Sequence, residues 1–566
     1  MKRIKKYLIP SIVTLVAAAL LFYVNLPAIN LRSSDFWGFI VTLFAIWFVV
    51  YLVCHFGAKN IIVFKTAHGK PNGEISFAND EVKRKIKIAL CVLLAIAAVV
   101  AIVAFVSSSR VFRASAYAEL LPVSESEFQK DISEISFSQI PVVDRDAAQI
   151  LGQRKIGDII ELVSQFEIED YYTQINIGET PYRVSPLRYA GFLKWIANRD
   201  EGIPYYIKID MADLTAAELV KLDQGIKYSP SEYFSRDLMR HVRFAFPTKM
   251  IEEISFEVDD SGHPFWILPY YTYRIGFVGG KDIAGIIIVD AVSGEMTQYD
   301  VSEVPNWIDR VYSDEIVLSQ ASDYGSLQNG FFNSIFVQRN VIKTTEGYNY
   351  IALRDDVWLY TGITSVVSDE SNIGFILVNL RTKETLRYTI NGAEEYSAMS
   401  SAMGQVQEKG YVATFPILVN IEGHPSYFIS LKDSAGTIKA YSFVSVTNYQ
   451  IVGVDYVSIN NAMNTYVGLL RENGLIGSGS GTIDPDNALE ATLKIDAISS
   501  AVVDGTTMYY IRFADNAALE SGKVYILAVK LSDDLPFLSA GDEIKITYVA
   551  NEDGVLSEIL SLEQVK

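Results

Sequence analysis

Cysteine is almost missing from this chain of 566 residues, which contains only Cys54 and Cys91. Both lie inside long apolar runs near the amino terminus. The chain after residue 107 therefore cannot form a disulfide bond, and it has no thiolate for nucleophilic catalysis or metal binding. Its stability has to come from hydrophobic cores, and a chain of this length predicts about three to four domains.

Short catalytic signatures are missing as well. The sequence has no His-Glu-x-x-His, Ser-x-x-Lys or Gly-x-Ser-x-Gly pattern. The stretch GFVGGKDI resembles a phosphate-binding loop, but Asp282 stands where a Ser or Thr would have to hold magnesium. We predict no catalytic residue, no cofactor, no metal and no enzyme activity. An exported hydrolase is the weaker alternative, because its candidate carboxylates, Glu394 and Glu395, are adjacent and would not face each other on a helix.

Basic residues are scarce beyond residue 107. The first 107 residues contain 12 Lys and Arg against 4 Asp and Glu, whereas the remainder contains 36 against 63, a net charge of −27. Affinity for nucleic acid comes from Lys and Arg that neutralise phosphates. The charge balance therefore predicts that nucleic acid is not a partner.

Three long apolar runs occupy the basic amino-terminal part and begin at Tyr7, Phe36 and Ile88. Each has about 20 residues without an internal charge, which is the length that crosses a hydrocarbon layer of ~30 Å. We predict a membrane domain, residues 1–110, with three transmembrane helices at about residues 7–28, 36–56 and 88–107.

Lysine and arginine precede the first run and fill the connection between the second and third. The positive-inside rule places both segments in the cytoplasm. We predict a protein of the cell membrane with a cytoplasmic amino terminus, and with residues from about 108 to 566 outside the cell.

Five hairpin-like segments recur beyond the membrane part, beginning at Glu201, Ser261, Glu346, Glu422 and Asp504. Each has a glycine, two or three turn residues and an aromatic pair that enters an alternating strand. We expect the glycine to adopt positive φ. His263 and His424 occupy a position that other copies fill with Ile or Tyr, so we interpret them as turn residues and not as metal ligands.

The whole pattern predicts an α+β fold class. The strand-turn-strand segments from Ala284 and Gly374 resemble PepSY modules, in which a small antiparallel sheet packs on a helix. The last 85 or so residues have about five strand-like segments and predict a small, OB-like β-barrel. The predicted divisions are an α+β module at 111–250, a PepSY-like module at 251–340, a second one at 341–473, a Gly/Ser linker at 474–482 and the barrel at 483–566.

One cationic stripe stands out in the acidic part, in SRDLMRHVRFAFPTK from Ser235. Its members are Arg236, Arg240, His241, Arg243 and Lys249. Arginine forks suit phosphate, so these residues are candidates for binding an anion or a partner. The alternative is that they pair with acidic neighbours or lie along apolar surface.

Several longer strings resemble a family of multi-span membrane proteins of Gram-positive (Firmicutes-type) bacteria, among them QINIGETPYRVSPLRYAGFLKW from Gln174 and EGYNYIALRDDVWLYTGITSV from Glu346. The resemblance implies a membrane anchor and a large extracytoplasmic domain with PepSY-like modules; it implies no ligand or site residue. We predict a non-enzymatic cell-envelope protein that scaffolds or regulates another exported protein or assembles with itself. The alternative is an extracytoplasmic sensor subunit that binds an anionic polymer, a lipid head group or a glycan.

Overall fold

The computed structural model describes residues 2–56, 65–67, 70–72, 88, 91, 95, 98–132, 140–157, 159–178, 180–213, 216–366, 368–476, 488–503, 506–514, 524–528, 532, 534–550 and 556–564. The chain divides into two compact units. The first contains residues 1–420 and 425–452, and the second contains residues 421–424 and 453–566.

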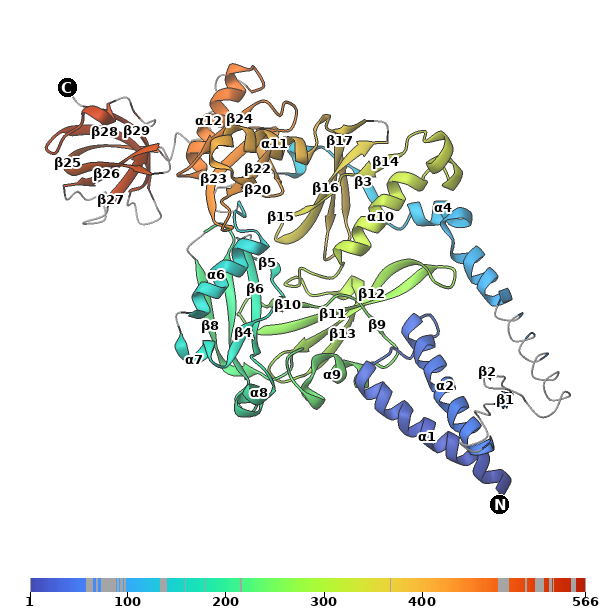
Figure 1. The fold of residues 1–566 in the computed structure, drawn as a ribbon. Coiled ribbons are helices and arrows are strands. Elements are labelled where there is room, and N and C mark those ends of the chain that lie inside the picture. The colour runs from blue at the N-terminus through green and yellow to red at the C-terminus, as the bar shows by residue number, and fades with distance from the viewer. Residues whose placement is uncertain are drawn as a thin grey trace. The chain divides into compact units, whose positions relative to one another are not determined.

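Three helices are long and apolar enough to cross a membrane: Tyr7–Asn25, Ser34–Tyr51 and Ala98–Ala118. The first two belong to α1 (Lys2–Asn25) and α2 (Ser34–Phe56), which pack side by side (Figure 1). The third is interrupted at Ser109, which has extended backbone and caps α4 (Arg110–Ala118). Three apolar helices are thus confirmed. The third lies further along the chain than the predicted 88–107, and most of 88–97 is outside the described residues. Between α2 and the third helix, β1 (Lys65–Ala67) and β2 (Lys70–Asn72) form a short antiparallel pair.

The first large sheet has the strand order β4-β6-β7-β8, with β5 paired to β6. Its strands are β4 (Phe166–Ile168), β5 (Thr173–Ile177), β6 (Thr180–Tyr189), β7 (Ile203–Asp210) and β8 (Ala217–Ile226). Three helices contact it: α6 (Arg145–Gly157), α7 (Ile160–Val163) and α8 (Phe192–Asn198). Five consecutive residues of β6, 183–187, are buried, so both faces of the sheet are covered along this part of the strand.

The second sheet has the order β10-β11-β12-β13, with β9 paired to β11. It consists of β9 (Met250–Ile251), β10 (Ser255–Val258), β11 (Pro264–Ile275), β12 (Gly279–Asp290) and β13 (Met296–Asp300). The short helices η2 (Phe234–Arg236) and α9 (Leu238–Ala245) precede it, and η3 (Val301–Glu303) follows it.

The third sheet has the order β14-β16-β17-β18-β3, with β15 paired to β16 and β19 to β17. Its strands are β14 (Ile342–Thr344), β15 (Asn349–Leu353), β16 (Asp356–Ser365), β17 (Ser368–Asn379), β18 (Thr385–Tyr388), β19 (Gly392–Ala393) and β3 (Val123–Glu125). The associated helices are α5 (Phe128–Asp131), α10 (Asp314–Leu327) and the π-helix η4 (Asn333–Val337). One hydrophobic core joins this sheet to the second, because side chains of β11, β12, α10, β16 and β17 pack in a single cluster.

The remaining strands of the first unit are β20 (Val412–Ala413), β21 (Ile417–Ile421), β22 (His424–Lys432) and β23 (Ile438–Ser445). They follow α11 (Glu395–Gln405) and η5 (Gln407–Lys409), and β20 and β23 lie on either side of β22. The chain then enters β24 (Val452–Asp455) and passes into the second unit.

The second unit contains α12 (Ile459–Glu472) and a five-stranded antiparallel sheet of order β27-β26-β25-β28-β29. These strands are β25 (Ala488–Val503), β26 (Thr506–Phe513), β27 (Val524–Ala528), β28 (Glu543–Ala550) and β29 (Leu556–Gln564), with η7 (Leu535–Phe537) before β28. The first half of β25 pairs with β28 and its second half pairs with β26. This long strand therefore lies in the middle of the sheet and connects the β28–β29 pair with the β26–β27 pair. Residues 477–482 of the predicted linker and part of the predicted barrel lie outside the described residues.

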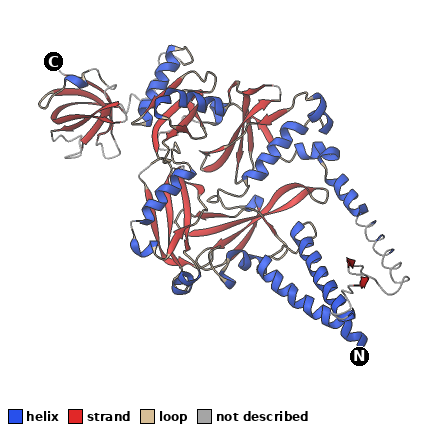
Figure 2. Cartoon of the chain, viewed as in Figure 1, coloured by secondary structure: helices blue, strands red, loops and turns tan. Residues whose placement is uncertain are grey.

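The chain therefore folds into both helices and antiparallel sheets, as the α+β prediction expects (Figure 2). The recurring turn glycines are confirmed in four of the five segments, because Gly202, Gly262, Gly347 and Gly423 all have φ between 75° and 106°. The fifth falls at Gly505, outside the described residues.

Candidate functional site

The predicted cationic stripe lies on η2, α9 and the turn after them. Asp237 caps α9 by accepting a hydrogen bond from the backbone N–H of Arg240. Within α9, Arg240 and Arg243 are three residues apart and therefore share one side of the helix. That side faces the carboxyl end of α1.

Both arginines bind backbone carbonyls at the end of α1. Arg240 Nε donates to the carbonyl of Tyr23 at 3.3 Å, and the guanidinium lies 4.4 Å from the centre of the Tyr23 ring. Arg243 is buried, with 5% of its surface exposed, and its Nε donates to the carbonyl of Leu26 at 3.0 Å. The last carbonyls of a helix have no partner within the helix. These two side chains supply partners and fix α1 to α9.

The other members of the stripe contact different neighbours. Arg236 donates to the carbonyl of Arg199, and His241 Nε2 donates to the carbonyl of Gly294 at 2.8 Å. The Lys249 ammonium lies 3.8 Å from the centre of the Tyr270 ring. The five residues do not converge on one space, and binding of an anion or partner by them stays a prediction.

The third membrane helix is attached to the tip of the β11–β12 hairpin. Ser108 Oγ accepts hydrogen bonds from the backbone N–H groups of Phe277 and Val278, at 2.9 and 3.1 Å. Tyr117 OH donates to the Ser108 carbonyl and accepts from the N–H of Gly280. The connection between α1 and α2 binds the same sheet, since Arg32 donates to the carbonyl of Tyr273 at 2.9 Å. The second sheet thus receives contacts from the α1–α2 connection and from the third apolar helix.

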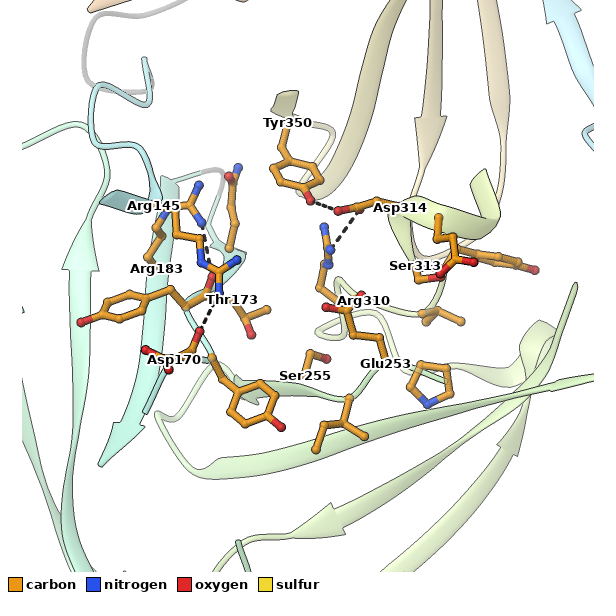
Figure 3. A pocket seen from close by; sticks show the side chains of 18 of the residues that line it. Arg145, Asp170, Thr173, Arg183, Glu253, Ser255, Arg310, Ser313, Asp314 and Tyr350 are labelled. Atoms are coloured by element: carbon orange, nitrogen blue, oxygen red, sulfur yellow. Dashed lines mark hydrogen bonds and ion pairs between the residues drawn. The ribbon is translucent and has the colours of Figure 1, made fainter. Parts of the chain in front are cut away.

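A pocket of about 770 Å³ opens between the first sheet and the loop that leads into α10. Figure 3 shows Arg145 and Arg183 on one side of it and Arg310, Asp314 and Tyr350 on the other. An adjoining cavity of about 200 Å³ shares Arg145, Arg183 and Tyr350 with it. Three arginines from distant parts of the chain therefore line one connected space.

Arg183 is the most unusual of these residues. It lies in the middle of β6 with 6% of its surface exposed, and its only hydrogen bond to a described residue is a long one, 3.3 Å, from Nη1 to the carbonyl of Tyr172. Its Nε has no partner, and Arg183 forms no ion pair with any described residue. Burial lowers the pKa of Arg183 to about 10. A buried guanidinium without a counter-ion is costly, since desolvation is not offset by attraction.

Gln174 stands directly opposite Arg183 on the neighbouring strand. The β5–β6 register pairs the two residues, which brings their Cβ atoms to within about 5.5 Å. Gln174 has 3% of its surface exposed, and its Nε2 has no hydrogen-bond acceptor among the described residues. The floor of the pocket therefore carries two adjacent buried donors that lack acceptors.

On the opposite wall of the pocket, the positive and negative side chains are paired with each other. Arg310 donates to Asp314 Oδ1 at 3.1 Å, and Tyr350 OH donates to the other oxygen of the same carboxylate (Figure 3). Burial raises the pKa of Tyr350, which keeps its hydroxyl a donor at neutral pH. Arg310 also lies 4.7 Å from the centre of the Tyr350 ring. This cation is already paired, in contrast to Arg183.

A buried pair of carboxylates holds the loop of Arg310 against β10. Glu257 is fully buried and accepts hydrogen bonds from the backbone N–H groups of Asp309 and Arg310, at 2.9 and 3.1 Å. Asp309 accepts from the N–H of Asn176 on β5 at 2.7 Å. Burial raises the pKa of Glu257 to about 6, and burial together with the Glu257 charge raises that of Asp309 well above its ordinary value. The pair connects both walls of the pocket.

Arg145, Arg183 and Arg310 were not singled out from the sequence. Arg183 lies on the same face of β6 as the buried Ser185 and Leu187, but this burial is a feature of the fold, and the sequence does not distinguish Arg183 from other strand residues. An arginine at such a position needs a counter-ion or a carbonyl partner. His263 Nε2 donates to Asp290 Oδ2 at 3.1 Å, and no group of three or more metal-binding side chains occurs in the part of the chain that the structure describes.

Comparison with known proteins yields no family model and no curated protein that matches. A solved structure, the crystal structure of a mutant of B. megaterium levansucrase, aligns with 77% of this chain and 99% of its own at 8% identity. Its TM-score is 0.17, which carries no argument about fold or function.

Proposed function

We propose that this chain is a non-enzymatic, membrane-anchored cell-envelope protein whose extracytoplasmic part binds an anionic group at Arg183. The observation that carries the proposal is the buried, unpaired guanidinium beside the unpaired amide of Gln174. Of the two functions expected from the sequence, this proposal takes the ligand-binding one. It locates the anion site at Arg183 and not at the arginines of α9.

The physical reason is the free-energy cost of the buried Arg183 charge when no anion is bound to it. A buried ion that lacks a partner costs several kcal/mol, and a ligand anion would supply the missing attraction. Charge-assisted hydrogen bonds from Arg to an oxyanion are about twice as strong as neutral ones. A pocket of about 770 Å³ is within the size range of small-molecule sites, roughly 300–1,000 Å³.

The orientation in the membrane belongs to the same proposal. Lys and Arg in the first six residues and in residues 59–87 support a cytoplasmic location for those segments and an extracytoplasmic one for the pocket, by the positive-inside rule. The identity of the sheet modules as PepSY-like and of the last sheet as OB-like also stays a proposal, supported by strand-turn-strand patterns and by five antiparallel strands in the second unit.

The test uses the full chain in nanodiscs of neutral lipid, with acetate as the probe. Thermal unfolding is followed in potassium acetate and in potassium chloride of equal ionic strength. Acetate at ten times its Kd is expected to stabilise the protein by about 1.4 kcal/mol. In Arg183→Met this gain disappears, while the stability without acetate is unchanged or higher because a costly buried charge is gone.

The matched control is Arg188→Met, on the same strand; Arg188 does not line this pocket, and it pairs with Glu167 at 2.9 Å and more distantly, at 3.8 Å, with Glu169 of the pocket wall. It should keep the full response to acetate. Equal stabilisation of the wild-type protein and Arg183→Met by acetate would contradict the proposal.

An exported partner or self-association remains a second candidate, and one surface feature favours it. The π-helix η4 exposes apolar side chains, with Phe336 77% and Val337 71% exposed. A photo-crosslinking residue at position 336 should capture an exported protein or a second copy, and one at position 193, where Leu193 is 76% exposed, serves as control. If both positions capture the same background, η4 is not a partner surface.

A further inference from the structure

We infer that the ligand of this pocket carries one carboxylate on an otherwise neutral or cationic body, as a free amino acid or the carboxyl end of a peptide does. This inference rests on the proposed function and names the class of ligand. Four features of the pocket lead to it: the number of unpaired cations, the donors at the floor, the charge of the rim and the space beyond the floor.

Only one buried cation of the pocket lacks a counter-ion among the described residues. Arg310 is paired with Asp314, and Arg145 is exposed at the mouth, where it donates to the carbonyl of Asp170 at 2.8 Å. Arg183 alone is both buried and unpaired among the described lining residues. One unneutralised buried charge matches one ligand charge, because a second buried anionic charge would itself lack a partner.

The floor also suits the shape of a carboxylate. A carboxylate has two oxygens that accept hydrogen bonds, and a guanidinium binds it with high directional preference. Arg183 Nε and Gln174 Nε2 are two donors without acceptors on directly paired positions of β5 and β6. A single carboxylate can satisfy both.

The rim has the opposite charge. The pocket is lined by three arginines and by five carboxylates, namely Glu169, Asp170, Glu253, Asp314 and Glu315. Of these, Asp170, Glu253 and Glu315 are exposed, and none of the three forms an ion pair with another described residue. The pocket as a whole is therefore net negative, with its unpaired positive charge at the floor.

This distribution disfavours polyanions. A phosphate polymer or a nucleic acid would bring several charges past exposed carboxylates, and like-charge contacts cost affinity and slow association. A zwitterion meets the same surface favourably, because its ammonium group or a basic side chain pairs with the rim while its carboxylate reaches the floor. The anionic wall polymer considered from the sequence fits this pocket poorly.

The remaining space is far larger than a carboxylate and is walled by aromatic side chains. Tyr171, Tyr312, Tyr348 and Tyr350 line it together with Pro269. Tyrosine offers apolar ring surface together with a hydroxyl that hydrogen-bonds to main-chain groups. These walls suit the backbone and side chains of a short peptide.

The test uses the full chain in neutral-lipid nanodiscs and two matched pools of tripeptides with randomised side chains. One pool has free carboxyl ends, and the other has the same peptides as carboxyl-terminal amides. Peptides retained by the protein are identified by mass spectrometry, and binding of the best retained free acid and its amide is measured by calorimetry. Alanine, inorganic phosphate and polyphosphate are titrated in parallel.

The free acid should bind at least tenfold more tightly than its amide, and Arg183→Met should remove this difference while Arg188→Met keeps it. Glu253→Gln together with Glu315→Gln should weaken binding of the unmodified peptide more than that of its N-acetylated form. Binding of alanine as strongly as of the peptide would identify the free amino acid as the source of the carboxylate. Equal binding of acid and amide, or tighter binding of phosphate or polyphosphate, would overturn the inference.

The acetate experiment distinguishes failure of the proposed anion site from failure of the proposed ligand class. If acetate stabilises the wild-type protein through Arg183 but acid and amide peptides bind equally, the anion site stands and the ligand class is wrong. If acetate has no effect that depends on Arg183 and no free acid is preferred, both proposals fail.

Discussion

Replacement of Arg243 by methionine should release the end of α1 from α9. Arg243 is buried and donates from Nε to the carbonyl of Leu26 at 3.0 Å and from Nη1 to that of Lys249 at 2.5 Å. Its third contact, to the carbonyl of Phe246, is long at 3.4 Å. Methionine keeps much of the apolar stem but none of the donors, so the change isolates the hydrogen bonds.

The magnitude follows from the bond to Leu26, which joins α9 to the end of α1, whereas the carbonyls of Phe246 and Lys249 belong to the segment after α9. A hydrogen bond from a charged group contributes about 1.5–3 kcal/mol. Removal of the guanidinium offsets part of this loss of stability. Burial lowers the pKa of Arg243, which means that keeping its charge desolvated costs free energy in the wild-type protein. We expect a net loss of about 1–2 kcal/mol in the docking of α1, which corresponds to a change of about 5- to 30-fold in the local opening equilibrium.

Hydrogen exchange of the full chain in nanodiscs measures this opening. The amide of Ile29 donates to the carbonyl of Pro247 at 2.7 Å, so it reports directly on the contact between the α1–α2 connection and the segment after α9. Peptides covering residues 26–33 should exchange about fivefold faster or more in Arg243→Met. Arg236→Met, which removes a neighbouring arginine whose hydrogen bond goes to the carbonyl of Arg199, should leave them unchanged. Equal protection in Arg243→Met and the wild-type protein would refute the reasoning.

Two further predictions concern the buried acids and the hairpin tip. Because burial raises the pKa of Glu257 to about 6, the folded state holds its proton to higher pH than the unfolded state, and the free energy of unfolding should fall as pH rises from about 4.5 through 6. Asp309→Asn keeps an acceptor for the N–H of Asn176 and removes the neighbouring charge, so it should reduce this fall and raise stability at pH 7 by on the order of 1 kcal/mol; a steeper fall in the variant, measured by denaturant unfolding across this pH range, would contradict it. Gly276→Ala should destabilise the attachment of the third membrane helix by roughly 1–3 kcal/mol, because Gly276 has φ 57° and a Cβ there would lie 2.4 Å from the carbonyl oxygen of Ser107; an unchanged melting temperature would show that the hairpin tip can move aside.

Features that depend on neighbours along the chain follow from the sequence alone. Apolar runs long enough to span a bilayer, the contrast between a basic beginning and an acidic remainder, and the α+β alternation are all readable from local composition and period. The turn glycines belong to the same group, since the positive φ at Gly202, Gly262, Gly347 and Gly423 is a requirement of each local turn.

The roles of the arginines, by contrast, depend on the packing of distant segments. Arg240 and Arg243 form a cationic stripe in the sequence, yet their partners are the carbonyls of Tyr23 and Leu26, more than 200 residues earlier. Arg183 resembles an ordinary strand residue in the sequence, yet in the fold it is buried without a counter-ion in a pocket whose other wall includes Arg310. Whether an arginine is paired, solvated or left for a ligand depends on which carbonyls and carboxylates the packing brings within about 3 Å of it. Those distances are set by contacts between segments far apart in the chain, and periodicity and composition carry no information about them.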